Sequence, residues 1–398
     1  MVGEDGAGPG RGVVLEVLRS PAYRRWSVTA QLVRLPSAML PLAFVLLATA
    51  ATGNYRLGGV MIAASTAAAV VMAAPAGRLL DRRNTVALMS WLLLGAAAVL
   101  GLLALAGALS LSGVLLVGLA VLGSSLSSGA PAGMRRILPV TVPTRLLTPA
   151  LAVDGIMVEL TVVCGPLLVA AAALVGEAGG VAAMALLTTL AAVLVRRLVS
   201  PPSRPVWAGE GVRRPRLLSP AFSFWLVIGA AAGQGIGSAE VCALPLAQQV
   251  GGGTLTAVAL QVTLCLASAV SGVVYAARSE RIPGSPVQRG MVLLGGLALG
   301  AVVLASGFGL AGLVAGYTLV GLCTAPLIVT MLRSVQEVAP DGRETEAFGL
   351  SSSSTGIGYV LAGTALAVLP LAGALLSGVI TIGICLLAAA VLRSRPAW

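Results

Sequence analysis

The sequence predicts an all-α integral membrane protein with twelve transmembrane helices in two pseudo-symmetric six-helix bundles. Hydropathy, the placement of charge and a faint internal repeat support this prediction. Of the 398 residues, 58% are hydrophobic and only 10% are charged, and the mean hydropathy is +0.99. Soluble domains carry about 25% charged residues. The chain is therefore predicted to cross a lipid bilayer many times.

Twelve apolar segments of the chain are each long enough to cross the bilayer. A helix needs about 20 apolar residues to span the roughly 30 Å hydrocarbon core. Very short junctions, such as 110–113 and 370–373, indicate that neighbouring helices are antiparallel. The predicted spans are 26–50, 58–77, 85–107, 111–133, 149–173, 180–199, 222–248, 254–277, 288–307, 310–332, 347–368 and 371–392.

Arginine is distributed asymmetrically around these spans. All 25 basic residues are arginines, and all except Arg34 and Arg56 fall in the tails or in segments predicted on the same side as the tails. Because positively charged loops stay in the cytoplasm, both termini are predicted to be cytoplasmic, in a multi-pass protein of the cell membrane. A pI near 10.6 suggests nucleic-acid binding in a soluble protein. Here the arginines lie in short membrane loops, so no nucleic-acid partner is expected.

A proline-rich connection divides the chain into two similar parts. Leu40-Pro41-Leu42-Ala43 recurs as Leu244-Pro245-Leu246-Ala247, an offset of 204 residues, and Asp81-Arg82 is echoed by Glu280-Arg281 at an offset of 199. These echoes favour parallel six-helix repeats. The predicted parts are a cytoplasmic tail (1–22), an N-terminal bundle (23–199), a cytoplasmic linker (200–221), a C-terminal bundle (222–393) and a second cytoplasmic tail (394–398).

A short charged segment separates the second and third spans. Gly77-Arg78-Leu79-Leu80-Asp81-Arg82-Arg83 is too short for a domain, so it is predicted to form a tight turn at the membrane surface. It resembles the loop between helices 2 and 3 of the major facilitator superfamily of secondary transporters. The matching residues are Gly77, Leu79, Asp81 and Arg82, whereas Asn84, Thr85 and Val86 replace the glycine and two basic residues of the family pattern.

The resemblance covers residues 23–393 and implies two halves that rock about a site at the membrane midplane. It assigns Gly77, Asp81 and Arg82 to a conformational latch. In this latch the Asp81 carboxylate accepts hydrogen bonds from the free N–H groups at the start of a helix in the other half, where the positive end of the helix dipole favours an anion. Helix 11 is the implied partner.

Four ionisable side chains fall inside predicted spans, where charge is costly and therefore marks functional candidates. Counted at 1.5 Å per residue, Arg34 and Glu159 lie near mid-membrane and Asp154 lies nearer the cytoplasmic face. The repeat offset brings Glu240 within about one turn of the level of Arg34. In the resembling family helices 1 and 7 line the central cavity, so Arg34 and Glu240 are expected near one another. All four are candidates for proton coupling, and Glu240 is the first choice.

Structural roles compete with these assignments. Arg34 and Glu159 are expected to form a structural pair within the N-terminal half if neither titrates, and Asp154 then reaches toward the cytoplasmic surface or caps a helix. Glu240 has no basic residue in its own span. A lone carboxylate in the membrane interior is costly unless it takes up a proton.

Polar residues near these groups are candidates for the substrate pathway. They are Gln31, Arg34, Gln234, Ser238 and Gln261. Each serves equally well as a hydrogen-bonding contact between helices. The Gly-Gln-Gly-Ile-Gly run at 233–237 lies in mid-span with no strand before it, so it indicates flexibility or close helix packing instead of a nucleotide loop.

Helix 5 carries Gly165-Pro166, which resembles the end of a longer glycine pattern in members of the superfamily that exchange protons for drugs. Thr161, Val169 and Ala170 replace three of its glycines. Those exporters also have a membrane-embedded arginine in helix 4, whereas Arg135 and Arg136 lie at the inner end of that span. The resemblance implies export of a small apolar or amphipathic compound, such as a drug or antibiotic, in exchange for protons. The alternatives are a transporter of a polar metabolite (a sugar or amino acid) and a non-transporting membrane scaffold.

Enzymatic chemistry has little support in the sequence. There is no histidine, and the five cysteines fall in apolar runs without metal-like spacing. No nucleophile–base pair occurs in the spans, so neither an enzyme, a metal site nor a cofactor is expected. The predicted partners are a small-molecule substrate, protons and the lipid bilayer, and the chain is expected to be a monomer.

Overall fold

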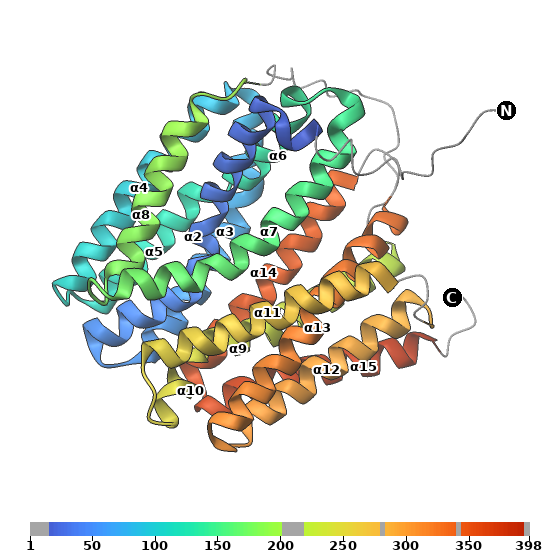
Figure 1. Cartoon of the computed structure of the whole chain (residues 1–398). Helices are drawn as coiled ribbons and strands as arrows, with labels where there is room; N and C mark the ends of the chain where they lie inside the picture. The colour runs from blue at the N-terminus through green and yellow to red at the C-terminus, as the bar shows by residue number, and fades with distance from the viewer. Residues whose placement is uncertain (1–15, 201–218, 279–282, 340–343, 394–398) are drawn as a thin grey trace.

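The computed structural model describes residues 16–200, 219–278, 283–339 and 344–393. The side chains of Asp81, Arg82 and Glu159 lie outside this description, although their backbone is helical. Over the described ranges the chain is built from α-helices and contains no strand (Figure 1). The helices are α2 (Pro21–Thr52), α3 (Tyr55–Arg82), α4 (Thr85–Ala108), α5 (Gly113–Ser127), α6 (Ala130–Thr141), α7 (Thr144–Ala173), α8 (Gly179–Val195), α9 (Pro220–Val241), α10 (Ala243–Gln249), α11 (Thr254–Arg278), α12 (Pro286–Ala305), α13 (Gly309–Val338), α14 (Glu344–Val368) and α15 (Leu371–Arg393).

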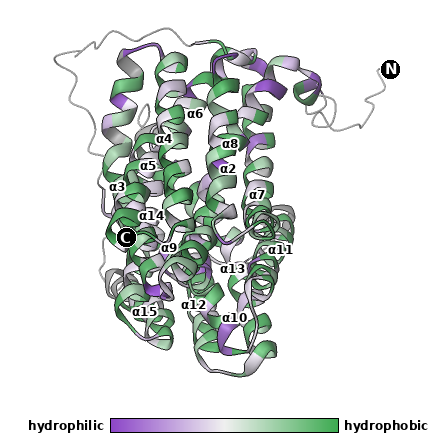
Figure 2. Cartoon of the chain, turned by 90° about the vertical axis from the view of Figure 1, so that its left-hand side faces the viewer, coloured by the Kyte–Doolittle hydropathy of each residue, from purple (hydrophilic) through white to green (hydrophobic). Residues whose placement is uncertain are grey.

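The helices are long and apolar enough for a multi-pass membrane protein. Within the described residues, nine helical segments meet the length and hydropathy of a membrane span, and Gly179–Val195 and Leu371–Leu387 are shorter apolar helices. The polar residues gather mainly at the end of the bundle near the N-terminus (Figure 2). The all-helical membrane fold is confirmed, while the count of twelve crossings stays a prediction.

Proline divides two of the predicted spans. Proline lacks the N–H that bonds the carbonyl four residues earlier, so a helix commonly ends there. Accordingly α5 ends at Ser127, four residues before Pro131, and α9 ends at Val241, four residues before Pro245. The spans predicted as continuous over 111–133 and 222–248 are each two helices.

The tight turn predicted over 77–83 is wrong. Helix α3 continues to Arg82, and the turn consists of Arg83 and Asn84 only. The helix continues because Leu80 is buried in a cluster with Met89 and Met134. Asn84 then begins α4 by accepting a hydrogen bond from the Ala87 N–H at 3.0 Å.

Helices α2–α8, coloured blue to green in Figure 1, lie together, and α9–α15 lie beside them. The two groups approach one another closely at the crossing of α3 and α14. A Cβ added at Gly59 would lie 2.7 Å from the Gly363 carbonyl oxygen, and one added at Gly363 would lie 2.8 Å from the Gly59 oxygen. Only glycine permits such backbone contact.

Close packing also explains the glycine run of α9. A Cβ at Gly233 would lie 2.2 Å from the Thr355 carbonyl oxygen, and one at Gly358 would lie 2.2 Å from the Ala230 oxygen. Helices α9 and α14 therefore pack backbone to backbone. This confirms the packing interpretation of residues 233–237 and fixes which residues of α14 stand opposite Glu240.

Candidate functional site

The first element of the candidate site is an ion pair between α2 and α7. The Arg34 guanidinium donates to both oxygens of Asp154, from Nη1 to Oδ1 at 2.6 Å and from Nη2 to Oδ2 at 2.8 Å. The two side chains are only 15% and 12% exposed. Two parallel charge-assisted bonds of this kind fix the orientation of both groups. The positive charge of Arg34 is therefore compensated within the first group of helices.

Two further polar residues complete this cluster. The Gln31 side chain donates from Nε2 to Asp154 Oδ1 at 3.3 Å, and its Oε1 accepts from the Thr161 hydroxyl at 2.7 Å. Gln31 lies one turn before Arg34 on α2, and Thr161 lies two turns after Asp154 on α7. Close contact of the helices at Gly165, where a Cβ would lie 2.8 Å from the Ala38 backbone, holds these partners together.

The pairing corrects the expected depth of Asp154. The sequence places Asp154 nearer the cytoplasmic surface, and it offers Glu159 as a partner of Arg34 only in the alternative, structural interpretation. Helix α7 begins at Thr144, so Asp154 lies ten residues, about 15 Å, along it; Arg34 lies thirteen residues, about 20 Å, along α2. Both helices begin five residues before the predicted spans, so the relative level of the two residues is unchanged, and the long Arg34 side chain bridges the difference of about 5 Å along the helix axes. The Glu159 side chain lies outside the described residues.

Arg135 lies beside this cluster, although the sequence placed it only at the inner end of helix 4. It belongs to α6, which packs against α2, and Trp26 of α2 donates from Nε1 to the carbonyl of the neighbouring Met134 at 2.9 Å. Arg135 is exposed and interacts electrostatically with both Arg34 and Asp154. Since Asp154 is already paired with Arg34, Arg135 adds a second positive charge beside this pair.

The second element of the site is the break between α9 and α10 at Cys242. A break in a helix leaves some backbone carbonyls without their helical hydrogen bonds. In a membrane these carbonyls need other partners. Side chains from two other helices supply them: Tyr317 of α13 donates to the Ala239 carbonyl at 2.7 Å, and Gln261 of α11 donates to the Glu240 carbonyl at 2.9 Å. Gln261, a pathway candidate from the sequence, thus holds the end of α9.

Glu240 lies in the last turn of α9, next to this break. Its Oε2 accepts a hydrogen bond from the Tyr359 hydroxyl of α14 at 3.1 Å. Both side chains are partly exposed. Within the described part of the chain this is the one side-chain hydrogen bond of the Glu240 carboxylate, and it has no ion pair there. The contact with Arg34 expected from the sequence is not among the described interactions, since Arg34 is bonded to Asp154.

Gln234 and Ser238 lie on the same helix as Glu240 but are buried. Gln234 donates from Nε2 to the Ser377 hydroxyl of α15 at 3.2 Å. Gln234 Oε1 and Ser238 Oγ have no hydrogen-bond partner among the described residues. Buried polar atoms without partners are costly. Both residues stay candidates for a pathway, on the face of α9 toward α15.

The latch residues are only partly described. Gly77 is half-buried, and a Cβ there would meet open space. Nearby, Arg136 of α6 donates from Nη1 to the Leu80 carbonyl at 2.9 Å and to the Thr85 hydroxyl at 3.0 Å. The structure thus assigns Arg136 to the end of α3, a role that the sequence did not indicate. Within the described ranges no three histidine, cysteine, aspartate or glutamate residues form a metal-binding group.

The fold is shared with solved membrane transporters. A mutant of the nucleoside transporter NupG aligns with a TM-score of 0.73 over 93% of this chain and 99% of that chain, at 11% sequence identity. A POT family transporter in complex with 5-aminolevulinic acid aligns with a TM-score of 0.71, at 12% identity, over 93% and 95% of the two chains. A bacterial homologue of the human lysosomal transporter Spinster aligns with a TM-score of 0.69, at 13% identity, over 98% and 100%.

No protein-family profile matches the sequence, and no curated protein matches it. The class of protein therefore rests on the fold. The chain is a multi-pass membrane protein that shares its fold with these solved transporters, and these structural neighbours are transporters instead of enzymes.

Proposed function

We propose that the chain is a proton-coupled secondary transporter that works by alternating access, with Glu240 as the acid that carries the proton. One observation carries this proposal: the Glu240 carboxylate lies in a membrane-spanning helix, is partly exposed, and is bonded by a neutral hydroxyl instead of a cation within the described residues. An intramembrane carboxylate of this kind marks a proton or substrate pathway.

Asp154 is less suited to this role. Its two oxygens are bonded to Arg34 in parallel, so protonation of Asp154 would leave a guanidinium in the membrane without its counter-ion. Within the described residues Glu240 has no cationic partner, so its protonation leaves no positive charge uncompensated. The position of Glu240 beside the α9–α10 break adds support, because discontinuous helices form the ion and substrate sites of many transporters.

The proposed substrate is a small apolar or amphipathic compound, and the proposed direction is export in exchange for protons. Few intramembrane side chains are polar, which favours such a substrate over a sugar. A second candidate is a polar metabolite with an anionic group. It is favoured by the exposed Arg135 beside the compensated Arg34–Asp154 pair.

The proposed architecture has twelve spans in two six-helix halves, α2–α8 and α9–α15, which meet at the glycine crossing of α3 and α14. The latch of Gly77, Asp81 and Arg82 stabilises one of the two conformations. Asp81→Asn is expected to slow transport while leaving substrate affinity nearly unchanged, because the latch does not touch the substrate. Transport kinetics measured at several substrate concentrations test this, and a pure loss of affinity would contradict it.

Reconstituted vesicles provide the test of the coupling role. The full-length protein is placed in liposomes with a pH gradient. Uptake of ethidium, uridine and dialanine is measured, and an internal pH-sensitive dye reports the accompanying movement of protons. These probes represent an amphipathic cation, a nucleoside and a peptide. Glu240→Gln keeps the size of the side chain and removes its titration. We expect it to abolish accumulation driven by the pH gradient while preserving exchange of substrate across the membrane.

Glu177→Gln is the matched control, because Glu177 is exposed in the turn between α7 and α8. It is expected to transport like the parent protein. Normal gradient-driven accumulation by Glu240→Gln would overturn the assignment. If none of the probes moves and no proton flux accompanies any of them, the scaffold alternative gains support.

A further inference from the structure

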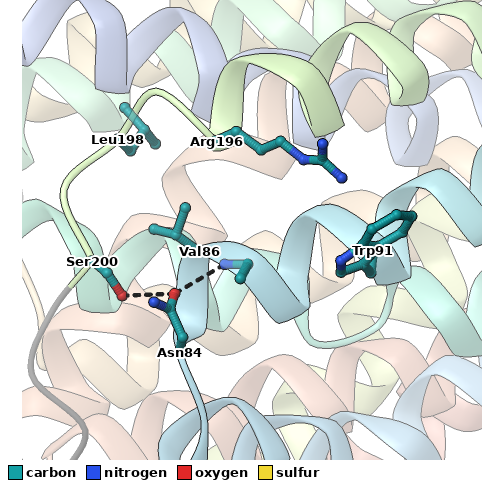
Figure 3. A pocket seen from close by; sticks show the side chains of 7 residues that line it. Asn84, Val86, Trp91, Arg196, Leu198 and Ser200 are labelled. Carbon is teal, nitrogen blue, oxygen red and sulfur yellow. Dashed lines mark hydrogen bonds between the residues drawn. The ribbon is translucent and has the colours of Figure 1, made fainter.

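A cavity lies on the outer surface of the helix bundle, apart from the site described above. It has a volume of about 420 Å³ and lies between the start of α4 and the end of α8 (Figure 3). This is the end of the bundle that carries most of the polar residues (Figure 2). The lining residues are Asn84, Val86, Ala87, Trp91, Arg196, Leu198 and Ser200.

The cavity lies where two lipid-facing strips of the bundle end. On α4 the exposed residues Leu105, Leu102 and Trp91 share one helical face, and on α8 Leu186, Leu190 and Val193 do the same. Both strips lead toward the cavity. Trp91 is 65% exposed, and a tryptophan at the end of an apolar strip is typical of the membrane–water interface. The cavity therefore lies at the level of the lipid headgroups.

Arg196 supplies the charge of the cavity. Its Nε donates to the Ser90 hydroxyl at 2.8 Å, and its guanidinium lies over the Trp91 ring, 4.8 Å from the ring centroid. These two contacts hold the guanidinium in place while, within the described residues, both terminal nitrogens lack a hydrogen-bond partner. A fixed arginine whose two terminal nitrogens form a free edge matches the geometry of a phosphate.

Asn84 adds a second donor. Its Oδ1 accepts from the Ala87 N–H and from the Ser200 hydroxyl, each at 3.0 Å (Figure 3). With the oxygen used in this way, the amide Nδ2 remains as a donor and has no hydrogen-bond partner among the described residues. None of the lining residues is acidic. Among the described residues next to the cavity, Arg83 and Arg197 are also exposed, and their charge disfavours a cationic headgroup.

We propose that this cavity binds the phosphate of an anionic phospholipid, with Arg196 and Asn84 as donors and Trp91 packed against the top of the acyl chains. Basic pockets between helices at the membrane surface recognise such headgroups. The lipid is favoured over a soluble anion because the cavity opens at the end of two apolar strips. This inference goes beyond the transport function and does not depend on it.

Lipid titration of the full-length protein in a neutral detergent tests the proposal. Binding of phosphatidylglycerol is measured by native mass spectrometry and by the rise in the unfolding temperature, with phosphatidylcholine and inorganic phosphate as comparison ligands. Arg196→Gln is expected to weaken phosphatidylglycerol binding about fivefold, the effect of one arginine near the membrane surface. Arg197→Gln removes an equal charge next to the cavity and is expected to have a smaller effect.

A second pair of variants guards against misfolding. Asn84→Asp keeps the helix cap, because aspartate caps as well as asparagine does, but it places a negative charge in the cavity. It is expected to weaken phosphatidylglycerol binding. Asn54→Asp is the matched control, since Asn54 caps α3 through the same kind of bond to the Arg56 N–H at 2.9 Å.

The outcomes separate the sources of the phosphate. Selective loss of phosphatidylglycerol binding in Arg196→Gln and Asn84→Asp supports the proposal. If phosphatidylglycerol binding falls equally in Arg196→Gln and Arg197→Gln, or equally in Asn84→Asp and Asn54→Asp, the proposal is overturned. General surface charge would then explain the binding. An equal rise in unfolding temperature with inorganic phosphate would replace the lipid with a soluble anion, and equal binding of phosphatidylcholine would remove the requirement for negative charge.

Discussion

The two intramembrane carboxylates described in detail, Asp154 and Glu240, have opposite surroundings. Asp154 is buried and accepts two charge-assisted bonds from Arg34, with Gln31 as a third donor. Glu240 is partly exposed and accepts one bond from a neutral phenol. The difference teaches that an ionisable residue in a span is not by itself a site of chemistry. Its partner decides whether it stabilises the fold or exchanges a proton.

The largest effect is expected when the compensated pair is broken. Asp154→Asn leaves the Arg34 guanidinium without its counter-ion, and loss of one partner of a buried pair costs about 3–5 kcal/mol. Because the side chains of Arg34 and Asp154 are still 15% and 12% exposed, the expected loss of stability is at the lower end of this range. Thermal unfolding in detergent measures the loss.

The double variant Arg34→Gln, Asp154→Asn serves as the control for this prediction, because it removes both charges together. It is expected to recover most of the lost stability. If Asp154→Asn is as stable as the parent protein, Asp154 does not compensate Arg34, and the contrast with Glu240 disappears.

A smaller effect is expected at the end of α9, where two tyrosines are compared. Tyr317→Phe leaves the buried Ala239 carbonyl without its donor and should lower the free energy of unfolding by about 1–3 kcal/mol. Tyr359→Phe removes the single neutral donor of Glu240, which is a partly exposed residue, so its effect on stability should be smaller. Unfolding curves compare the two, and gradient-driven transport should fall in Tyr359→Phe. Equal destabilisation would indicate that Tyr359 is structural as well.

The smallest effect is expected at the edge of the Arg34 cluster. Thr161→Val keeps the shape of the side chain and removes its hydroxyl from Gln31 Oε1, a change expected to cost about 0.5–1.5 kcal/mol. Thr188→Val is a matched control, because the Thr188 hydroxyl bonds only to the Met184 carbonyl within its own helix. A loss in Thr161→Val no greater than that in the control would show that Gln31 does not need this partner.

The all-helical membrane fold was predictable from the sequence, because hydropathy is a strong signal, and rare intramembrane charge marked the candidate residues. The partners were not. Arg34 pairs with Asp154, three residues from its level along the predicted spans, although the sequence placed Asp154 nearer the cytoplasmic surface. Hydropathy defines the spans but not which side chains of two neighbouring helices face one another.

The break at Cys242 had a signal that was not used, namely Pro245 inside an apolar span. The same Leu-Pro-Leu-Ala motif at Pro41 lies within the continuous helix α2, so proline alone did not decide the outcome. The difference lies in the surroundings of α9, where Gln261 and Tyr317 take up the carbonyls near the break. Such partners come from distant parts of the chain and are visible only in the fold.

The Arg34–Asp154 pair also has a consequence for biogenesis. Its two residues are 120 positions apart, and at about 5–20 residues per second the ribosome adds Asp154 roughly 6–24 s after Arg34. A lone arginine at the centre of a helix costs about 2.5–3.5 kcal/mol on insertion. The apolar residues of the first helix must therefore offset this cost until α7 arrives. The pair thus stabilises the finished bundle but not the insertion of its first helix.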